Sequence, residues 1–183
     1  MEEAAEQALI ARCRSGSDAA FSELVDRYKN LVYAVILRTI DDRSRADDLA
    51  QEVFLRVFRG LPEFRGDSTL ATWLFRITRN VCVETRNRRQ FEHALQSLDA
   101  EVPGRSEAGT TDRAFTDLEL RDRLDKALAQ LPAAARFIVS AHYLGGKKYE
   151  DLAQALDLPV GTVKTHIHRA KRRLRALLES EHE

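Results

Sequence analysis

Residues 160–175, VGTVKTHIHRAKRRLR, hold six Lys or Arg side chains and no acid, although the whole chain balances 29 basic against 29 acidic residues. Apolar residues recur here three and four positions apart, which predicts an amphipathic helix with its cations on the other faces; they are Val160, Val163, Ile167, Ala170, Leu174 and Leu177. An exposed helix usually mixes charge signs, so a one-sign face indicates a negatively charged partner, such as the phosphates of DNA. A solvated basic face is the alternative.

A shorter helix is predicted just before it, in KKYEDLAQALDLP, with Leu152, Ala153 and Leu156 as its apolar stripe. Pro159 cannot continue that helix, and Asp157 falls where the turn needs a left-handed residue. A helix, a short turn and a basic helix form a helix-turn-helix pattern, whose second helix enters a DNA groove. An ordinary helical hairpin with a basic tail remains possible. If the basic helix binds DNA, its first turns reach base edges, and the later cations contact phosphate; these are Arg172, Arg173 and Arg175.

The elements that position this motif are predicted to be helices throughout, which makes the chain all-α. Residues 96–117 are poor in large apolar side chains and rich in small and polar ones, so they are expected to form a flexible linker. The chain then divides into a domain at 1–95, the linker at 96–117 and a four-helix domain at 118–183. In the first domain helices are expected over about 3–15, 18–40 and 44–61, and a fourth from near Ser68.

Two surfaces of the first domain carry polar groups that could bind a partner. The outer face of helix 44–61 shows Asp47, Asp48, Gln51 and Glu52, although acids in a first helical turn also suit the helix dipole. The helix after Ser68 is expected to be capped by Ser68 or Asp67. Its outer face is expected to interleave the rings of Trp73 and Phe75 with Arg76, Arg79 and Asn80, as binding of single-stranded nucleic acid requires. Trp73 as an ordinary core ring is the alternative.

Other functions find little support in the residues. Cys13 and Cys82 lack metal-ligand spacing, and His166 with His168 lacks a third ligand, so we expect no metal and no cofactor. The longest apolar run, residues 31–37, is too short to span a bilayer, and the acidic N-terminus is no secretory signal. We therefore expect a cytoplasmic protein without membrane insertion.

Two long stretches together resemble one known family. Residues 46–89, ADDLAQEVFLRVFRGLPEFRGDSTLATWLFRITRNVCVETRNRR, look like region two of extracytoplasmic-function (ECF) sigma factors, group IV of the sigma superfamily. Residues 131–175 look like their region four. The resemblance implies a transcription initiation factor, not an enzyme, whose partners are core RNA polymerase (the β′ clamp helices and the β flap), promoter DNA and an anti-sigma factor. It also implies that the linker threads the polymerase channels.

The resemblance assigns roles residue by residue. Polymerase docking falls on Asp48, Gln51 and Glu52. Capture and reading of the −10 element fall on Phe64, Arg65, Gly66, Asp67, Ser68, Thr69, Trp73, Arg76 and Asn80. Recognition of the −35 element falls on Thr162, Lys164, Thr165, His166, His168 and Arg169, with a DNA backbone contact at Arg136. The two histidines depart from the residues common in relatives, which leaves the bases read there open.

The loop before the fourth helix has two interpretations. PEFRGDSTLATW places Pro62 and Gly66 around a loop with Phe64 and Arg65 at its rim, where a base flipped out of the DNA stack could enter. The alternative is a capping turn with Phe64 packed inward.

Other classes of protein would require sequence features that differ from those of a sigma factor. A helix-turn-helix regulator that acts without polymerase is one alternative, but a response regulator would need a strand-rich receiver domain, which the sequence does not predict. A helical enzyme would need paired carboxylates, a phosphate loop or an activated nucleophile, and we identify none. Promoter-specific transcription with core polymerase would separate these classes.

Overall fold

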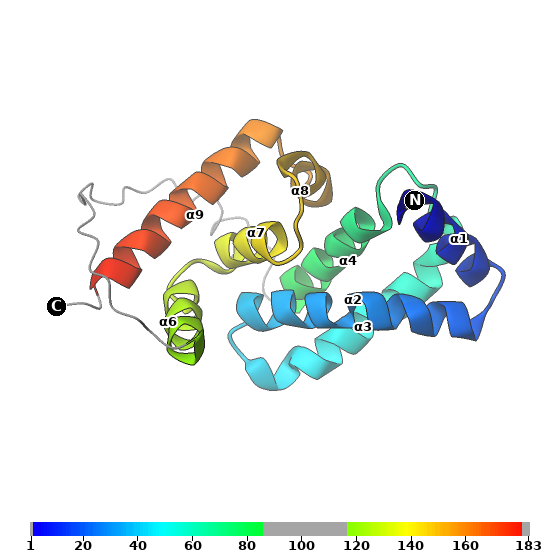
Figure 1. Cartoon of the computed structure of the whole chain (residues 1–183), viewed down its shortest axis with the longest axis horizontal. Helices are drawn as coiled ribbons and strands as arrows, with labels where there is room; N and C mark the ends of the chain where they lie inside the picture. The colour runs from blue at the N-terminus through cyan, green and yellow to red at the C-terminus, as the bar shows by residue number, and fades with distance from the viewer. Residues whose placement is uncertain (1, 86–116, 181–183) are drawn as a thin grey trace.

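The computed structural model describes residues 2–85 and 117–180, all of whose regular elements are helical (Figure 1). This confirms the all-α prediction for the described residues. The predicted linker lies outside them, apart from Asp117. Among the described residues, no helix combines the length and the apolarity that crossing a bilayer requires.

The first half consists of α1 (Glu2–Arg14), α2 (Asp18–Thr39), α3 (Ala46–Gly60) and α4 (Leu70–Thr85). Ser17 starts α2 because its side chain accepts a hydrogen bond from the amide of Ala20. The apolar stripes of the four helices meet in one core, whose fully buried members include Leu24, Ile36, Val53, Val57 and Leu70. Two short 3-10 turns, η1 (Arg43–Arg45) and η2 (Leu61–Glu63), flank α3, so α3 begins two residues later than predicted.

The second half consists of α6 (Asp117–Ala129), α7 (Ala133–Tyr143), α8 (Tyr149–Leu156) and α9 (Val160–Ser180). Asp157 closes α8 in the left-handed conformation, with φ 56° and ψ 46°, as the sequence predicted. Leu120 and Leu124 of α6 are 49% and 40% exposed, and Leu128 and Leu131 are buried against α9 and α7.

The two halves are in contact, with α7 packed on α2 and α8 packed on α4 (Figure 1). They share one apolar cluster, to which the first half contributes Val35, Phe75 and Val83. Phe75 was expected on an exposed face, but it is only 3% exposed. One residue beside it is Gly145 of the second half, where an added Cβ would lie 2.6 Å from the Phe75 ring and 2.5 Å from the carbonyl oxygen of Ala141. A glycine is therefore required at this contact.

Candidate nucleic-acid interface

The loop from Pro62 to Thr69 begins within η2, leads into α4 and is fixed at its far end by a helix cap. The hydroxyl of Thr69 accepts a hydrogen bond from the amide of Thr72 at 3.1 Å and lies 2.8 Å from the Thr72 hydroxyl. The helix also begins its backbone ladder there, since the amide of Trp73 donates to the Thr69 carbonyl. The predicted caps, Ser68 and Asp67, are therefore wrong by one or two residues. Gly66, at the apex of the loop, has a φ of +82°.

Phe64 is not at the rim of this loop. Its side chain is 6% exposed, and its ring lies 5.0 Å from that of Trp73 between centroids, tilted by 41°. The inward-packed alternative considered above describes Phe64 correctly. Trp73 is half-buried, so one part of its ring supports Phe64 and another part remains accessible.

A cavity of about 360 Å³ opens beside the loop, within the range that small-molecule sites occupy. Its lining combines an aromatic ring with charged and hydroxyl groups: Glu63, Phe64, Arg65, Asp67, Ser68, Thr72, Trp73, Arg76, Gln154 and Ala155. Gln154 and Ala155 come from α8. The Gln154 side chain donates to the Asp67 carbonyl at 3.2 Å, and the Thr72 hydroxyl donates to Asp151 at 3.3 Å. One wall of the cavity is therefore supplied by the second half of the chain.

Eight of the nine residues assigned to the −10 element border this cavity or the loop beside it. The ninth, Asn80, lies four residues further along α4 than Arg76, and its side-chain oxygen accepts a hydrogen bond from Arg79 at 3.3 Å. Arg65, Gly66, Asp67, Thr69 and Arg76 are exposed, and Ser68 and Asn80 are partly exposed. An accessible ring, cations and hydroxyl groups in one place are the groups that bind an unpaired base and its phosphate.

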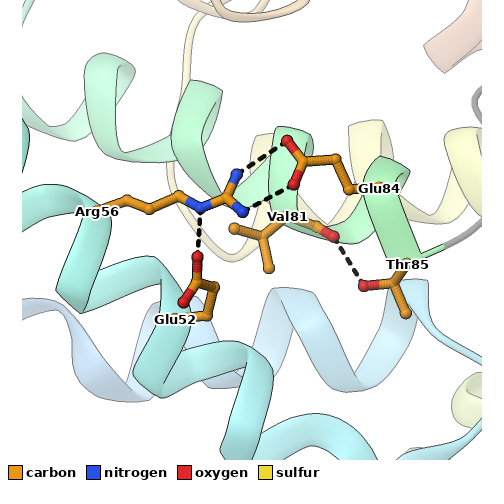
Figure 2. A network of polar contacts seen from close by, with 5 residues as sticks. All are labelled: Glu52, Arg56, Val81, Glu84 and Thr85. Atoms are coloured by element: carbon orange, nitrogen blue, oxygen red, sulfur yellow. Dashed lines mark hydrogen bonds and ion pairs between the residues drawn. The ribbon is translucent and has the colours of Figure 1, made fainter.

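The outer face of α3 holds a second candidate surface. Asp48 and Gln51 are exposed there, one helical turn apart. Glu52 is paired with Arg56, whose Nε donates a hydrogen bond to it at 2.6 Å. Both terminal nitrogens of Arg56 also donate to the carboxylate of Glu84 in α4, at 2.8 and 2.7 Å (Figure 2). The guanidinium of Arg56 lowers the pKa of Glu84. Glu52 therefore belongs to a network that joins α3 to α4.

Two apolar residues on the same face of α3 were not predicted. Leu55 is 42% exposed and Phe58 is 54% exposed, seven and ten residues after Asp48. These spacings place them on the Asp48 side of the helix. Leu55 falls outside the apolar stripe that faces the core, and the ring of Phe58 meets that of Phe21 in α2 edge-on, with 5.0 Å between centroids. Their position outside the stripe was the signal in the sequence.

The cationic face of α9 is arranged largely as predicted. Lys164, Thr165, His168 and Arg172 are exposed, and Thr162, Arg169 and Arg173 are partly exposed. His166 differs from them. Its side chain is 6% exposed, its Nδ1 has no hydrogen-bond partner among the described residues, and burial lowers its pKa. His166 therefore faces inward in this arrangement.

Arg136, assigned to the DNA backbone, also faces inward and is 6% exposed. Its guanidinium donates to the carbonyls of Ala129, at 3.0 Å, and Thr39, at 2.9 Å, and to the carboxylate of Asp41. Thr39 and Asp41 belong to the first half of the chain. In this arrangement Arg136 links the two halves.

Comparisons with known proteins match both halves. Residues 24–92 match the family model of Sigma-70 region 2, and residues 121–174 match that of Sigma-70 region 4. The chain is 34% identical to the RNA polymerase sigma-H factor of Pseudomonas aeruginosa, over 91% of this chain and 90% of that protein. It is 31% identical to the ECF RNA polymerase sigma-E factor of Escherichia coli K12, over 93% and 92% of the two chains.

A solved structure is similar to both halves together. It is the sigma factor RpoE in complex with the anti-sigma factor NepR from Bartonella quintana, with a TM-score of 0.66 and 26% identity. The similarity covers 87% of this chain and 96% of that one.

Proposed function

The chain belongs to the ECF sigma factors of RNA polymerase, and we propose that three separate surfaces divide its work between polymerase docking, −10 capture and −35 recognition. As a sigma factor it binds core RNA polymerase, recognises promoter DNA and promotes the melting that starts transcription. It is an initiation factor and not an enzyme. The proposal concerns which residues perform each step, and it treats 1–95, 96–117 and 118–183 as region two, linker and region four.

Polymerase docking is assigned to the exposed face of α3. Asp48 and Gln51 can contact one partner surface together, and the exposed side chains of Leu55 and Phe58 extend that face with apolar area. An exposed polar and apolar strip on one helix suits a helical partner such as the β′ clamp helices, because the apolar residues gain most from burial. Glu52 contributes through its position in the network with Arg56 and Glu84.

Capture of a −10 base is assigned to the loop and the cavity beside it. The observation that supports this most is that the first half alone supplies Trp73, Ser68, Arg65 and Arg76 to the lining of the cavity of about 360 Å³. Extracting a base from the stack costs a few kcal/mol, so the site must offer stacking and hydrogen bonds in return. The pocket's composition can offer both.

Recognition of the −35 element is assigned to α9. Thr162, Lys164, Thr165, His168 and Arg169 lie in its first turns, where a recognition helix meets base edges, and Arg172 and Arg173 follow where phosphates pass. His166 and Arg136 are buried in this arrangement. They can contact DNA only if the residues that cover them move when the protein binds DNA.

An anti-sigma factor is the further partner that we propose, because a similar sigma factor was solved in complex with NepR. We also place the protein in the cytoplasm, where RNA polymerase transcribes the chromosome.

The docking assignment can be tested with core polymerase and a double variant, Asp48→Ala with Gln51→Ala, beside Phe58→Ala. Both should keep the native circular dichroism spectrum and weaken core binding by about 5- to 30-fold, the usual effect of removing one strong interface contact. Asp26→Ala is the matched control, since Asp26 is an exposed acid on α2 that pairs with Lys29. Unchanged core affinity in both variants would contradict the assignment of α3.

A further inference from the structure

Helix α1 lies before the region that the family models match, which begins at residue 24, and none of the roles assigned above falls on it. In Figure 1 it lies beside the segment that leads into α4. The helix contacts the chain on both sides of the loop from Pro62 to Thr69, through one residue near each of its ends.

Glu6 holds the end of the loop that enters α4. One carboxylate oxygen accepts a hydrogen bond from the amide of Leu70, the first residue of α4, at 3.1 Å. The other oxygen accepts from the hydroxyl of Tyr28, in α2, also at 3.1 Å. Glu6 is half-buried, and Leu70 and Tyr28 are 1% and 7% exposed. One side chain thus joins three helices at the point where the loop ends.

The amide that Glu6 accepts from is one that the helix itself cannot satisfy. The first amides of an α-helix have no partner within it, and the positive end of its dipole favours a carboxylate. The Thr69 hydroxyl accepts the hydrogen bond of the Thr72 amide. The acceptor for the Leu70 amide is Glu6, which lies 64 residues earlier in the chain. The start of α4 is therefore fixed partly by α1 and not only by its own cap.

The other end of the loop meets the C-terminal end of the same helix. Nε of Arg14 donates to the carbonyl of Leu61 at 3.4 Å, a long and therefore weak hydrogen bond. Between the two contacts, Leu9 and Ile10 are buried in the core cluster that also contains Leu61, Phe64 and Leu70. Helix α1 therefore contacts residues at both ends of the loop.

We propose that α1 is a positioning element for promoter melting and that Glu6 is its principal positioning residue. The inference rests on the proposed role of the loop in base capture. Fixing both ends of a short loop before DNA arrives reduces the conformational entropy that the loop loses when it closes on a base. Loss of Glu6 should therefore slow promoter opening without touching the surfaces that bind polymerase or the −35 element.

The test uses the full chain assembled with core polymerase. Glu6→Ala should leave core affinity and closed-complex formation unchanged and slow opening about tenfold, as expected for one lost hydrogen bond to a charged group. Permanganate reactivity of promoter thymines measures opening, and transcription on a template with a mismatched, already unpaired −10 region should recover. Tyr28→Phe, which removes the second partner of Glu6, should give a smaller effect in the same direction.

Two further variants separate positioning from general stability. Glu6→Gln keeps an acceptor for Leu70, and its amide can donate to the Tyr28 hydroxyl, so it should open promoters far better than Glu6→Ala. Arg12→Ala removes the exposed pair of Arg12 with Glu23, which joins α1 to α2 away from the loop, and should open promoters normally. Equal defects in Glu6→Ala and Arg12→Ala, or a defect that persists on the unpaired template, would overturn the proposal.

The role of the loop itself is tested by a separate variant, in which glycines replace residues 65–69. If that variant opens paired DNA normally, the proposed capture site is wrong, whatever Glu6 does. If it fails on paired DNA and Glu6→Ala does not, only the inference about α1 is wrong.

Discussion

The guanidinium of Arg136 donates a hydrogen bond to the carboxylate of Asp41, which lies 95 residues earlier in the chain. Arg136 is almost entirely enclosed, with 7% of its side chain exposed, whereas 62% of the Asp41 side chain is exposed. The resemblance to sigma region four assigns Arg136 to the DNA backbone, and it cannot contact phosphate and Asp41 in the same geometry. Binding of DNA through Arg136 therefore requires this contact between the halves to break.

Asp41→Ala should favour that break. Because the variant leaves the enclosed guanidinium of Arg136 without its carboxylate, it should lower the free energy of unfolding by about 1–3 kcal/mol. It should raise the affinity of the isolated chain for a −35 duplex, measured by fluorescence anisotropy at fixed salt.

Asp42→Ala is the control, since it removes the same charge from a residue that caps η1 through Ser44. An equal gain in both variants would mean that net charge, and not release of Arg136, explains the change.

The positions of the helices follow from the sequence because they depend on local periodicity and turn chemistry. The bounds of α2, predicted at about 18–40 and found at Asp18–Thr39, and the left-handed Asp157 are examples. Phe75 could not be placed in this way. It lies on the polar side of α4 by local pattern, yet Gly145 and α7 of the other half cover it.

The candidate site was predicted less completely than the helices. The short polar segment 67–69 offers three side chains that can cap a helix, and the geometry of the loop selects Thr69. Phe64 packs inward because Trp73, nine residues later, provides a ring beside it. The contact between Glu6 and Leu70 spans 64 residues and leaves no local signal.

A second prediction separates two cations of α9. Arg169→Ala should weaken recognition of the matched −35 element by about 1–3 kcal/mol if it makes a base contact. Arg173→Ala should weaken matched and mutated elements alike, as loss of a phosphate contact would. Binding of the polymerase complex to both kinds of element is the measurement. An equal loss on all sequences for Arg169→Ala would exclude base reading by that residue.

A third prediction concerns acid stability through His166. Burial lowers the pKa of its imidazole below the ordinary value of 6.5 that it regains on unfolding. Below about pH 6.5 the unfolded chain then binds more protons than the folded one, so stability falls as pH falls. The contribution of neutral His166 is complete above the unfolded pKa and is lost as pH drops through the folded one.

Thermal unfolding between about pH 7 and pH 5 measures this dependence. In His166→Leu the decline towards acid pH should be shallower than in the native chain. His168→Leu, which changes an exposed histidine two residues later on the same helix, should keep the native slope. The same slope in all three proteins would show that His166 is not the group responsible.

The last prediction concerns Gly66, at the apex of the loop between η2 and α4. Phe64→Ala would be an ambiguous test of this loop, because its buried ring supports Trp73 and the core. Gly66 offers a cleaner one: its φ is +82°, and an added Cβ would meet no atom within 4 Å. Alanine there strains the backbone by about 1–2 kcal/mol without any steric clash. Gly16, between α1 and α2, has a φ of +81° and equally open surroundings, so Gly16→Ala provides the same strain away from the cavity.

Both alanine variants should therefore lose similar stability in thermal unfolding, but only Gly66→Ala should open a paired promoter slowly. Gly66→Asn should open it faster than Gly66→Ala, because asparagine tolerates the left-handed conformation better. Permanganate reactivity of −10 thymines, together with transcript yield on paired and premelted templates, gives the comparison. Matching opening rates for Gly16→Ala and Gly66→Ala would show that the conformation of this loop does not limit melting, and base capture would have to be assigned elsewhere.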